Sequence, residues 1–314
     1  MKIVFFTDHF VPEISAPAAH IYDRCKIWVD QGHDVTVITN VPNYPLGKTY
    51  SGYSNHFRQW EKIDGIKVLR VLTYMAENKG TIKRTLDYIS FAISSFFNSL
   101  SIKKPDVVYS SSPHIFTPLG AIAYSFLKRA PHVLEVRDIW PDSIAATTGM
   151  RKNSILYKVF KFFEMFLYKT SKHIVVFTES FKKNLIEKGV PIHKLHVVIN
   201  GANLSLFNKP TYDKNLAKSL KLDNKFVIGY MGTHGLSHDL LNVIRAASLI
   251  EDNDIQFLFV GEGAEKASMV NLAKKLSLQN VHFIGRQARK DIPKFWGICN
   301  AGLVHLKNDP VFKT

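Results

Sequence analysis

The chain carries, from Pro131 to Ser143, the stretch Pro-His-Val-Leu-Glu-Val-Arg-Asp-Ile-Trp-Pro-Asp-Ser. Its first part, residues 132–136, predicts a short buried strand, because apolar residues dominate and the helical period is absent. Arg137, Asp138 and Trp140 follow directly, and Pro141 stiffens the turn. Ligands of open α/β sheets bind at the carboxyl ends of the strands, so this turn is favoured as a sugar-phosphate site. The alternative is a loop with a buried Trp and a local Arg–Asp ion pair.

Composition and length indicate a globular chain with room for two domains. The 314 residues are 46% hydrophobic and 21% charged, which excludes a disordered protein. No apolar run reaches the roughly 18 residues of a membrane span. The N-terminus turns acidic at Asp8, so it predicts a first strand rather than a signal peptide. Cys25 and Cys299 lie far apart in the sequence, which favours a reducing, cytoplasmic setting.

The formal net charge is +15 and is concentrated in the first part of the chain. Residues 1–199 hold 26 Lys+Arg and 16 Asp+Glu, a net of +10, which leaves +5 for the remainder. Such a field favours anionic partners, namely a membrane leaflet, nucleic acid or phosphorylated substrates.

Strands and helices alternate through the first 199 residues. The expected strands are residues 3–7, 34–39, 65–71, 106–110, 132–136, 173–177 and 195–199. The expected helices are residues 16–31, 82–101, 116–128, 154–171 and 179–188. Residues 40–64 are rich in Tyr, Asn, Gly and Pro. A loop of that length inside a compact domain predicts a lid or a mobile segment.

The alternation restarts after a polar, lysine-rich linker at residues 209–224. Strands are expected at residues 226–231, 255–260, 281–284 and 301–305, and helices at 238–249, 264–276 and 291–296. Two successive strand–helix series predict an α/β fold with two doubly wound domains, 1–199 and 200–314, facing a cleft.

Two segments are candidates for binding phosphate through backbone amides. Ser15 is a plausible N-cap for the first helix, with Ala16 and Pro17 in its first turn, and the N–H groups there could hold a phosphate. The small residues serve close packing of helix and strand equally well, and the two interpretations are compatible. The turn Gly232-Thr233-His234-Gly235 follows the first strand of the second domain, where His234 and His238 could bond phosphate oxygens. Taken alone, a glycine pair in such a turn is more often turn geometry.

Further polar residues follow other strands. Gly261-Glu262-Gly263 resembles half of a dinucleotide fingerprint but lacks the third glycine and the first-strand position, so NAD binding is disfavoured. Arg286 follows a strand end and could contact a nucleotide. His20, His114 and the run Ser110–Ser112 are candidates for contacts with a second substrate. Asp252-Asn253-Asp254 lies at the opposite end of the sheet and predicts a solvated turn, so no metal site is expected.

Two predicted helices combine aromatic and basic residues. Residues 154–171 place Lys158, Lys161 and Lys169 among four phenylalanines, Phe160, Phe162, Phe163 and Phe166. This composition suits a helix lying on a membrane surface, but most amphipathic helices face a core. Core packing is favoured for most of the rings, and lipid contact by the lysines stays open. The same alternatives apply to residues 82–101, which Lys83-Arg84 and Lys103-Lys104 flank.

Taken together, these segments resemble one family. The chain is similar to the retaining glycosyltransferases of the GT-B fold in family 4, and most of all to bacterial O-antigen and capsule enzymes that resemble L-fucosamine transferases. The similarity covers essentially the whole chain and is carried by Pro12–Ala19, Gly32–Val37, Val41–Pro45 with Gly47, Arg137–Ser143, Asn200-Gly201 with Phe207, Gly232–Gly235 and Gly261–Gly263.

The resemblance implies transfer of a hexosyl or N-acetylhexosaminyl group from a nucleotide-diphosphate sugar, with UDP as the expected nucleotide. The acceptor it implies is a glycan on a polyprenyl diphosphate, met by a peripheral enzyme at the anionic inner face of the cytoplasmic membrane. The first domain would bind acceptor through His20, Tyr44, His114 and Trp140. Donor would contact Ser15, Ala16, Gly232, Thr233, His234, Gly235, His238, Gly261, Gly263 and Arg286.

The resemblance also implies a mechanism. Family members retain the anomeric configuration by front-face attack, and the diphosphate leaving group takes the acceptor proton. The protein then stabilises the leaving-group charge, and neither a metal nor a cofactor is expected. Arg137 and Asp138 stand where many relatives have a catalytic-loop histidine, and we expect them to orient sugar or acceptor.

Two other functions remain as alternatives. A sugar-nucleotide 2-epimerase shares the fold and would act without a lipid acceptor. A nucleic-acid-binding protein would show strongly salt-dependent binding, but no motif supports it, so nucleic acid is not an expected partner.

The end of the chain carries one more expectation. Relatives have an acidic pair, Glu-x7-Glu, and a final helix downstream of a segment like residues 309–314. The second domain is therefore expected to be incomplete, and these 314 residues are expected to bind donor poorly and to turn over slowly or not at all.

Overall fold

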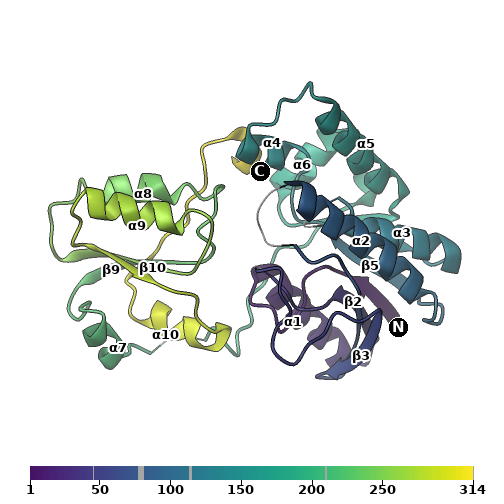
Figure 1. The fold of residues 1–314 in the computed structure, drawn as a ribbon, viewed down its shortest axis with the longest axis horizontal. Coiled ribbons are helices and arrows are strands. Elements are labelled where there is room, and N and C mark those ends of the chain that lie inside the picture. The colour runs from purple at the N-terminus through teal and green to yellow at the C-terminus, as the bar shows by residue number, and fades with distance from the viewer. Residues whose placement is uncertain (45, 77–80, 113–114, 209–210, 314) are drawn as a thin grey trace. The chain divides into compact units, whose positions relative to one another are not determined.

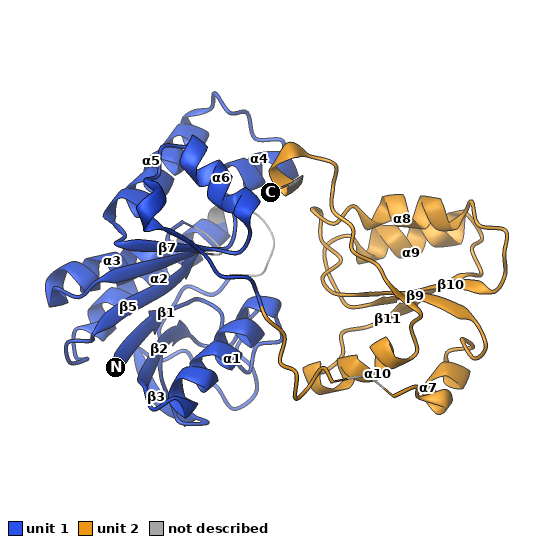
Figure 2. Cartoon of the chain, turned by 180° about the vertical axis from the view of Figure 1, so that it is seen from behind, with its two compact units in different colours: residues 1–200, 314 blue, residues 201–313 orange. Residues whose placement is uncertain are grey.

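The computed structural model describes residues 1–44, 46–76, 81–112, 115–208 and 211–313. It divides the chain into two compact units, Met1–Asn200 and Gly201–Lys313 (Figure 2). Each unit is described by itself below. Across the ranges that the structure describes, we find no helix with the length and apolar content needed to cross a bilayer.

The first unit is built on an eight-stranded sheet with the order β3-β4-β2-β1-β5-β6-β7-β8. Every neighbouring pair is parallel except β3 with β4. The strands are β1 Lys2–Phe6, β2 Asp34–Asn40, β3 Arg58–Ile63, β4 Ile66–Val71, β5 Val107–Ser112, β6 His132–Val136, β7 His173–Val176 and β8 Leu195–Val197. In register, Ile3 lies opposite Val35 of β2 and Val107 of β5.

Helices cover both faces of this sheet (Figure 1). They are α1 Ala16–Asp30, α2 Thr81–Ser99, α3 Thr117–Lys128, α4 Asp142–Thr148, α5 Ile155–Thr170 and α6 Glu179–Glu187, and a 3-10 turn, η1 Ile192–Lys194, precedes β8. Successive strand residues point to opposite faces. Accordingly Ile3 and Phe5 pack in the cluster of α1, whereas Val4 and Phe6 pack in the cluster of α2 and α3.

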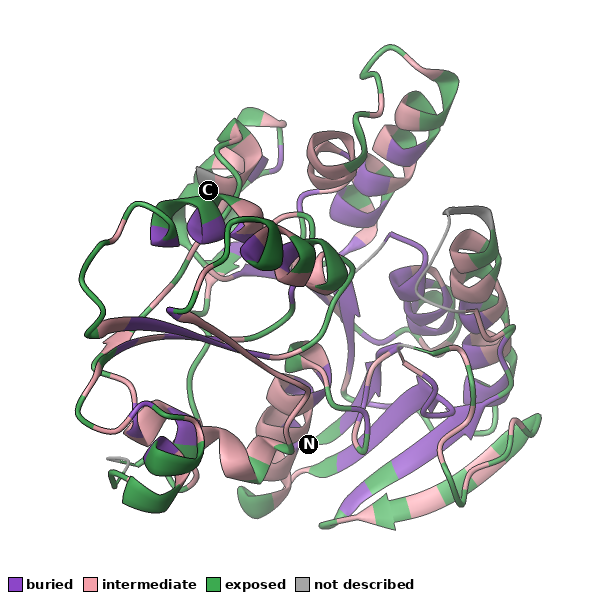
Figure 3. Cartoon of the chain, turned by 60° about the vertical axis from the view of Figure 1, so that its left-hand side comes forward, coloured by how far each residue is buried: buried purple, intermediate pink, exposed green. Residues whose placement is uncertain are grey.

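A third core cluster lies beneath α3 and α5. Ile122 of α3 meets Phe160 and Leu167 of α5 there, over Leu134 and Val136 of β6. Figure 3 shows the buried residues concentrated along the central strands. Helix α5 begins where the serine pattern predicts, since the Ser154 hydroxyl accepts the Tyr157 N–H at 3.2 Å.

The second unit has a four-stranded parallel sheet with the order β11-β10-β9-β12. Its strands are β9 Phe226–Met231, β10 Ile255–Val260, β11 Val281–Ile284 and β12 Ala301–Gly302. Its helices are α7 Lys214–Ser219, α8 Leu240–Ala247, α9 Lys266–Lys275 and α10 Ile292–Gly297, with 3-10 turns η2 Arg289–Asp291 and η3 Pro310–Lys313. Two core clusters, one on each face, hold α8 and α9 against one side and α7 and α10 against the other.

Three elements differ from the sequence expectation. The stretch predicted as irregular up to residue 64 contains β3, an edge strand whose residues alternate between exposed and half-buried. The polar segment predicted as a linker contains the short helix α7, which Asp213 caps by accepting the Leu216 N–H. The turn after Trp140 continues as α4. Each of these three elements is short or polar. Packing against neighbouring elements stabilises it, and hydrophobic periodicity does not mark it in the sequence.

Candidate functional site

The carboxyl ends of the parallel strands in the first unit gather a group of ionisable side chains. Asp8 and His9 follow β1, Asn43 and Tyr44 follow β2, and Asp87 lies on α2. Together they surround a cavity of about 50 Å³ that is lined by Asp8, His9, Glu13, Asn40, Asn43, Tyr44, Ala76, Arg84, Asp87 and Tyr88. We call this the strand-end pocket. Its lining offers several oxygen acceptors and few cations, as a ligand rich in hydroxyl groups requires.

His9 is the charged centre of the strand-end pocket. Its Nδ1 lies 2.8 Å from Glu13 Oε2, and its Nε2 lies 3.8 Å from Asp8 Oδ2. Burial opposes the charged imidazolium, but the carboxylates of Asp8, Glu13 and Asp87 outweigh it and raise the pKa of His9 to about 9. Burial also raises the pKa of Asp87 to about 7, despite the nearby His9. The strand-end pocket thus holds a charged imidazolium among carboxylates.

Glu13 ties this pocket to the loop after β2. Its Oε1 accepts the N–H groups of Asn43 at 2.9 Å and Tyr44 at 3.0 Å. The Tyr44 ring stands edge-on to His9 with 5.1 Å between centroids. The sequence motifs predict Tyr44 as a site residue but not His9, Glu13 or Asp87. Two features of the sequence indicate His9 and Glu13. Asp8-His9 comes directly after the first strand, and Glu13 follows His9 by four residues.

A second polar group surrounds Glu135 of β6, whose side chain is fully buried. Its carboxylate pairs with Arg24 of α1 and with Arg137, whose Nη1 lies 2.8 Å from Oε1. The hydroxyls of Tyr109 and Ser111 also donate to it. Burial would raise the pKa of Glu135, but the two guanidinium groups hold it below its ordinary value. The network fixes Arg137 at the end of β6.

Arg137 and Asp138, the predicted catalytic pair, have different surroundings. The Arg137 guanidinium lies over the Phe177 ring, 5.2 Å from its centroid, and its ion pair is with Glu135. The local Arg–Asp ion pair that the sequence offered as an alternative is therefore wrong, because Arg137 pairs with Glu135. An alternating strand places Glu135 and Arg137 on one face, which brings these side chains together. Asp138 is exposed as a residue, but desolvation by the surrounding protein raises the pKa of its carboxyl group to about 6.

The other predicted residues of the first unit are placed as follows. The Ser15 hydroxyl caps α1 by accepting the Ala18 N–H at 3.3 Å, and Ala16 is exposed at the same turn. His20 is half-buried on α1. Trp140 packs edge-on against Phe160, 5.6 Å between centroids, at the margin of a core cluster. His114 lies outside the described residues.

In the second unit, two glycine turns lie in contact at the carboxyl edge of the sheet. A Cβ on Gly261 would lie 1.9 Å from the Gly232 carbonyl oxygen, and one on Gly263 would lie 2.3 Å from the His234 carbonyl oxygen. Side chains at these positions are excluded by backbone. Close packing of the two turns thus explains the glycines after β10.

The first turn has amides available for a ligand. The Gly232 N–H donates to Val260 and the His234 N–H to Glu262, whereas Thr233 and Gly235 have no backbone acceptor among the residues described. The predicted contact of His234 with phosphate stays a prediction, and neither ring nitrogen has a hydrogen-bond partner among the described residues. The ring is fully buried between Tyr230 and Phe259, and burial lowers its pKa to about 4. His238 is half-buried, and burial lowers its pKa as well.

Cations complete this edge of the second sheet. Arg286 is half-buried two residues beyond β11, adjacent to Gly285. Lys266, which the sequence analysis missed, reaches back from α9 to donate to the Gly261 carbonyl at 3.0 Å and to Glu262 Oε1 at 2.6 Å. The sequence feature that could have indicated Lys266 is its position three residues after the second glycine turn. Amides and cations at one edge suit an anionic ligand.

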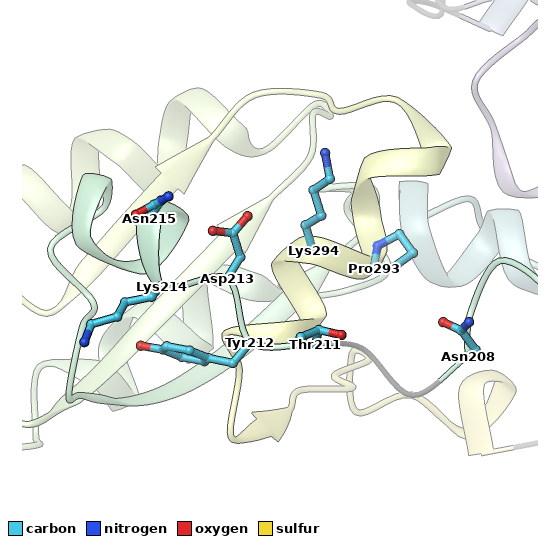
Figure 4. Close-up of a pocket in the computed structure, with 8 residues that line it drawn as sticks. All are labelled: Asn208, Thr211, Tyr212, Asp213, Lys214, Asn215, Pro293 and Lys294. Carbon is cyan, nitrogen blue, oxygen red and sulfur yellow. The ribbon is translucent and has the colours of Figure 1, made fainter.

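A larger hollow of about 470 Å³ lies elsewhere in the second unit (Figure 4). It is lined by residues around the start of α7 and of α10, Asn208, Thr211, Tyr212, Asp213, Lys214, Asn215, Pro293 and Lys294. Figure 4 shows Lys214 directed away from Lys294. The lining includes neither glycine turn, and the strand-end rule favours the turns as the ligand site.

Comparisons with known proteins identify the families that the two units match. Residues 15–201 match the family described as glycosyl transferase 4-like domain, and residues 211–309 match glycosyl transferases group 1. WcaI of Escherichia coli K12, named as a glycosyl transferase of colanic acid biosynthesis, is 28% identical over 319 residues, 98% of this chain and 77% of that protein.

Solved structures share the fold. Anabaena HepE in complex with UDP-glucose matches with a TM-score of 0.67 at 16% identity, over 98% of this chain and 74% of that one. WaaG, a glycosyltransferase involved in lipopolysaccharide biosynthesis, matches with a TM-score of 0.70 at 11% identity, over 98% and 76%. The fold is therefore GT-B, with two Rossmann-like α/β units, as the resemblance implied. The chain belongs to the glycosyl transferase 4-like family.

Proposed function

We propose that this chain transfers a hexosyl or N-acetylhexosaminyl group from a UDP-sugar to a lipid-linked glycan, with retention of configuration, during synthesis of a bacterial surface polysaccharide. The observation that carries the proposal is the match of both units to glycosyltransferase families. The colanic acid name of WcaI and the UDP-glucose bound to HepE support the pathway class and the donor class.

The donor diphosphate is proposed to bind at the glycine turns of the second unit. The N–H groups of Thr233 and Gly235 would meet phosphate oxygens, and Arg286 would add a positive charge at the same edge. His238 would act as a neutral donor, because burial lowers its pKa. Charge developing on the leaving diphosphate would then be stabilised by fixed dipoles and a cation, and that diphosphate would accept the proton of the attacking hydroxyl.

The acceptor sugar is proposed to bind in the strand-end pocket of the first unit. Carboxylates of Asp8 and Asp87 and the amide of Asn40 line it, and such groups accept hydrogen bonds from sugar hydroxyls. Tyr44 offers a ring beside His9, while His20, His114 and Trp140 remain proposed acceptor contacts. Arg137, held by Glu135, and Asp138 are proposed to orient the reacting groups.

Nucleotide titration followed by a transfer assay tests the proposal. We expect UDP to bind the chain more tightly than ADP or GDP in calorimetry. Arg286→Gln should weaken UDP binding about tenfold or more, since a hydrogen bond to a charged group contributes roughly 1.5–3 kcal/mol. Lys290→Gln, which removes an exposed cation close in sequence, should leave UDP binding unchanged.

The transfer assay supplies a UDP-sugar with and without a polyprenyl-diphosphate glycan. Product that appears only with the acceptor supports transfer. Interconversion of nucleotide sugars without an acceptor would instead establish an epimerase. Absence of UDP binding by the wild-type chain would refute the proposed donor.

A further inference from the structure

The strand-end pocket is too small to enclose a sugar ring. Its volume of about 50 Å³ lies far below the roughly 300–1,000 Å³ of pockets that surround a whole small molecule. It still exceeds the roughly 10–15 Å³ that a single water molecule needs. The pocket therefore has room for one substituent of a sugar, and the ring that carries this substituent would stay outside.

The wall of the pocket contains a hydrogen-bond acceptor that lacks a donor. Asn40 ends β2 and is 6% exposed, and among the described residues its Oδ1 has no hydrogen-bond partner. A buried oxygen left in this state is unfavourable. The residue is held in place, because Arg70 Nη1 donates to the backbone carbonyl of Asn40 at 3.0 Å. Asn40 Oδ1 is thus a fixed acceptor for a ligand that carries a donor.

His9 brings a donor to the same pocket. Its Nδ1 is engaged by Glu13 Oε2 at 2.8 Å, whereas its Nε2 lies 3.8 Å from Asp8 Oδ2, which is beyond hydrogen-bond length. Burial lowers the pKa of His9, but the surrounding carboxylates outweigh burial and raise this pKa to about 9. Both ring nitrogens therefore carry a proton at neutral pH, and Nε2 suits a ligand atom that accepts a hydrogen bond.

Charges of both signs line the pocket. Asp8, Glu13 and Asp87 contribute carboxyl groups, and His9 and Arg84 contribute cations. Burial raises the pKa of Asp87 to about 7, so its carboxyl group is only partly ionised at neutral pH. A ligand carboxylate would be repelled by the acids and a ligand ammonium by the cations, and either would also lose its hydration. A neutral polar group fits this lining best.

We propose that the strand-end pocket selects the hydroxymethyl group of a hexopyranose on the acceptor glycan. The hydroxyl of that group donates to Asn40 Oδ1 and accepts from His9 Nε2, so a single substituent satisfies both atoms. A methyl group in its place leaves both atoms without a partner. The exocyclic carbon carries the hydroxyl one bond further from the ring than a ring hydroxyl reaches, which suits a cavity of this size. The inference rests on the proposed function, because it takes the pocket as the acceptor site.

Ligand-observed NMR titration of the full chain tests the proposal without turnover. The probes are methyl β-D-glucopyranoside, its 6-deoxy and 6-amino-6-deoxy analogues, and the corresponding glucuronide. The same set in the galacto series presents the hydroxymethyl group beside the other configuration at C4. We expect a parent hexoside to bind at least about tenfold more tightly than its three analogues, because each analogue leaves a buried polar atom unpaired or buries a repelled charge.

Two neighbouring substitutions provide a matched comparison. Asn40→Ala removes the acceptor, and it should reduce the preference for the parent hexoside over the 6-deoxy analogue at least about fivefold. Thr39→Val removes another buried oxygen that has no partner among the described residues, but Thr39 lies outside the described lining of the pocket. Consecutive strand residues point to opposite faces, so Thr39→Val should keep the wild-type preference. The comparison of analogues with wild-type protein needs neither variant.

Three results would overturn the proposal. The first is wild-type protein that binds no hexoside, or that binds the parent and 6-deoxy sugars alike. The second is tighter binding of an amino or acid analogue than of its parent. The third is an unchanged preference in Asn40→Ala. Calorimetry with UDP and the transfer assay test the proposed function separately. A chain that binds UDP and transfers sugar, yet shows no preference for the hydroxymethyl group, contradicts this inference alone.

Discussion

At Gly261, the packing of the two glycine turns in the second unit depends on the absence of a side chain. Its φ of +150° is a conformation that other residues rarely adopt, and the carbonyl of Gly232 occupies the space that a Cβ would need. Because the obstacle is backbone rather than a flexible side chain, an added methyl group must separate the two glycine turns. The donor site proposed for those turns would be displaced with them.

Gly261→Ala is therefore expected to destabilise the second unit by roughly 1–3 kcal/mol. Thermal unfolding followed by circular dichroism measures the effect. Gly201→Ala is the matched control, since a Cβ there meets no atom within 4 Å. An unchanged melting temperature for Gly261→Ala would contradict the packing described here.

The raised pKa of His9 makes the free energy of unfolding depend on pH. Its pKa is 6.5 in an ordinary setting and about 9 in the folded chain. A raised pKa means that the stabilising charge interaction is fully present below pH 6.5 and disappears as the pH rises through about 9. We expect the wild type to lose stability across this window, through the weakening of the interactions of His9 with Asp8, Glu13 and Asp87.

The test compares melting temperatures of the wild type and His9→Gln from pH 6 to pH 10. The variant should lack the His9 part of the decline, and His56→Gln, which alters an exposed histidine, should keep it. Parallel curves for wild type and His9→Gln would show that folding does not raise the pKa of His9.

Among the elements, α5 shows that a local cap sets where a helix begins, whereas tertiary packing sets its orientation. Its start is set locally, because the Ser154 hydroxyl satisfies the Tyr157 N–H. Its orientation is set by burial of Phe160 and Leu167 under α3 and β6. The amphipathic pattern predicts core packing for most of its phenylalanine rings, whereas Phe162 and Phe166 are exposed. Similar aromatic residues on adjacent turns thus have opposite surroundings.

Ser154→Ala should lower the unfolding free energy of the first unit by about 1 kcal/mol, the usual contribution of an N-cap. Denaturant unfolding monitored by tryptophan fluorescence provides the measurement. The control is Asn153→Ala, one residue outside the cap and exposed. If both variants unfold at the wild-type midpoint, the hydroxyl does not stabilise the helix.

At the scale of the whole molecule, the chain has two units with separate cores. Three clusters belong to Met1–Asn200 and two to Gly201–Lys313. The connection around residues 198–205 is largely exposed, and Leu204 is 76% exposed. Exposed connections with few contacts are the usual sites of proteolytic nicking.

Brief chymotrypsin digestion should therefore cut first near Leu204 or Phe207 and leave two resistant fragments. Mass spectrometry identifies their ends. Leu204→Ser together with Phe207→Ser should slow this cut without changing the fragments produced by a nonspecific protease. First cleavage inside a described strand of either sheet would contradict the separation of the cores.

The amino-acid sequence was sufficient to predict the alternation of strands and helices and therefore the two α/β units, because buried strands need continuous apolar runs and helices need a period and a cap. It located the glycine turns and Arg137 at strand ends for the same reason. It did not reveal β3 and α7, whose polar residues have no periodic signal. It took the three-dimensional packing to show that Glu135 holds Arg137, that His9, Glu13 and Asp87 meet, and that two of the four phenylalanine rings of α5 are exposed. These depend on contacts between segments far apart in the chain, which a local pattern does not specify.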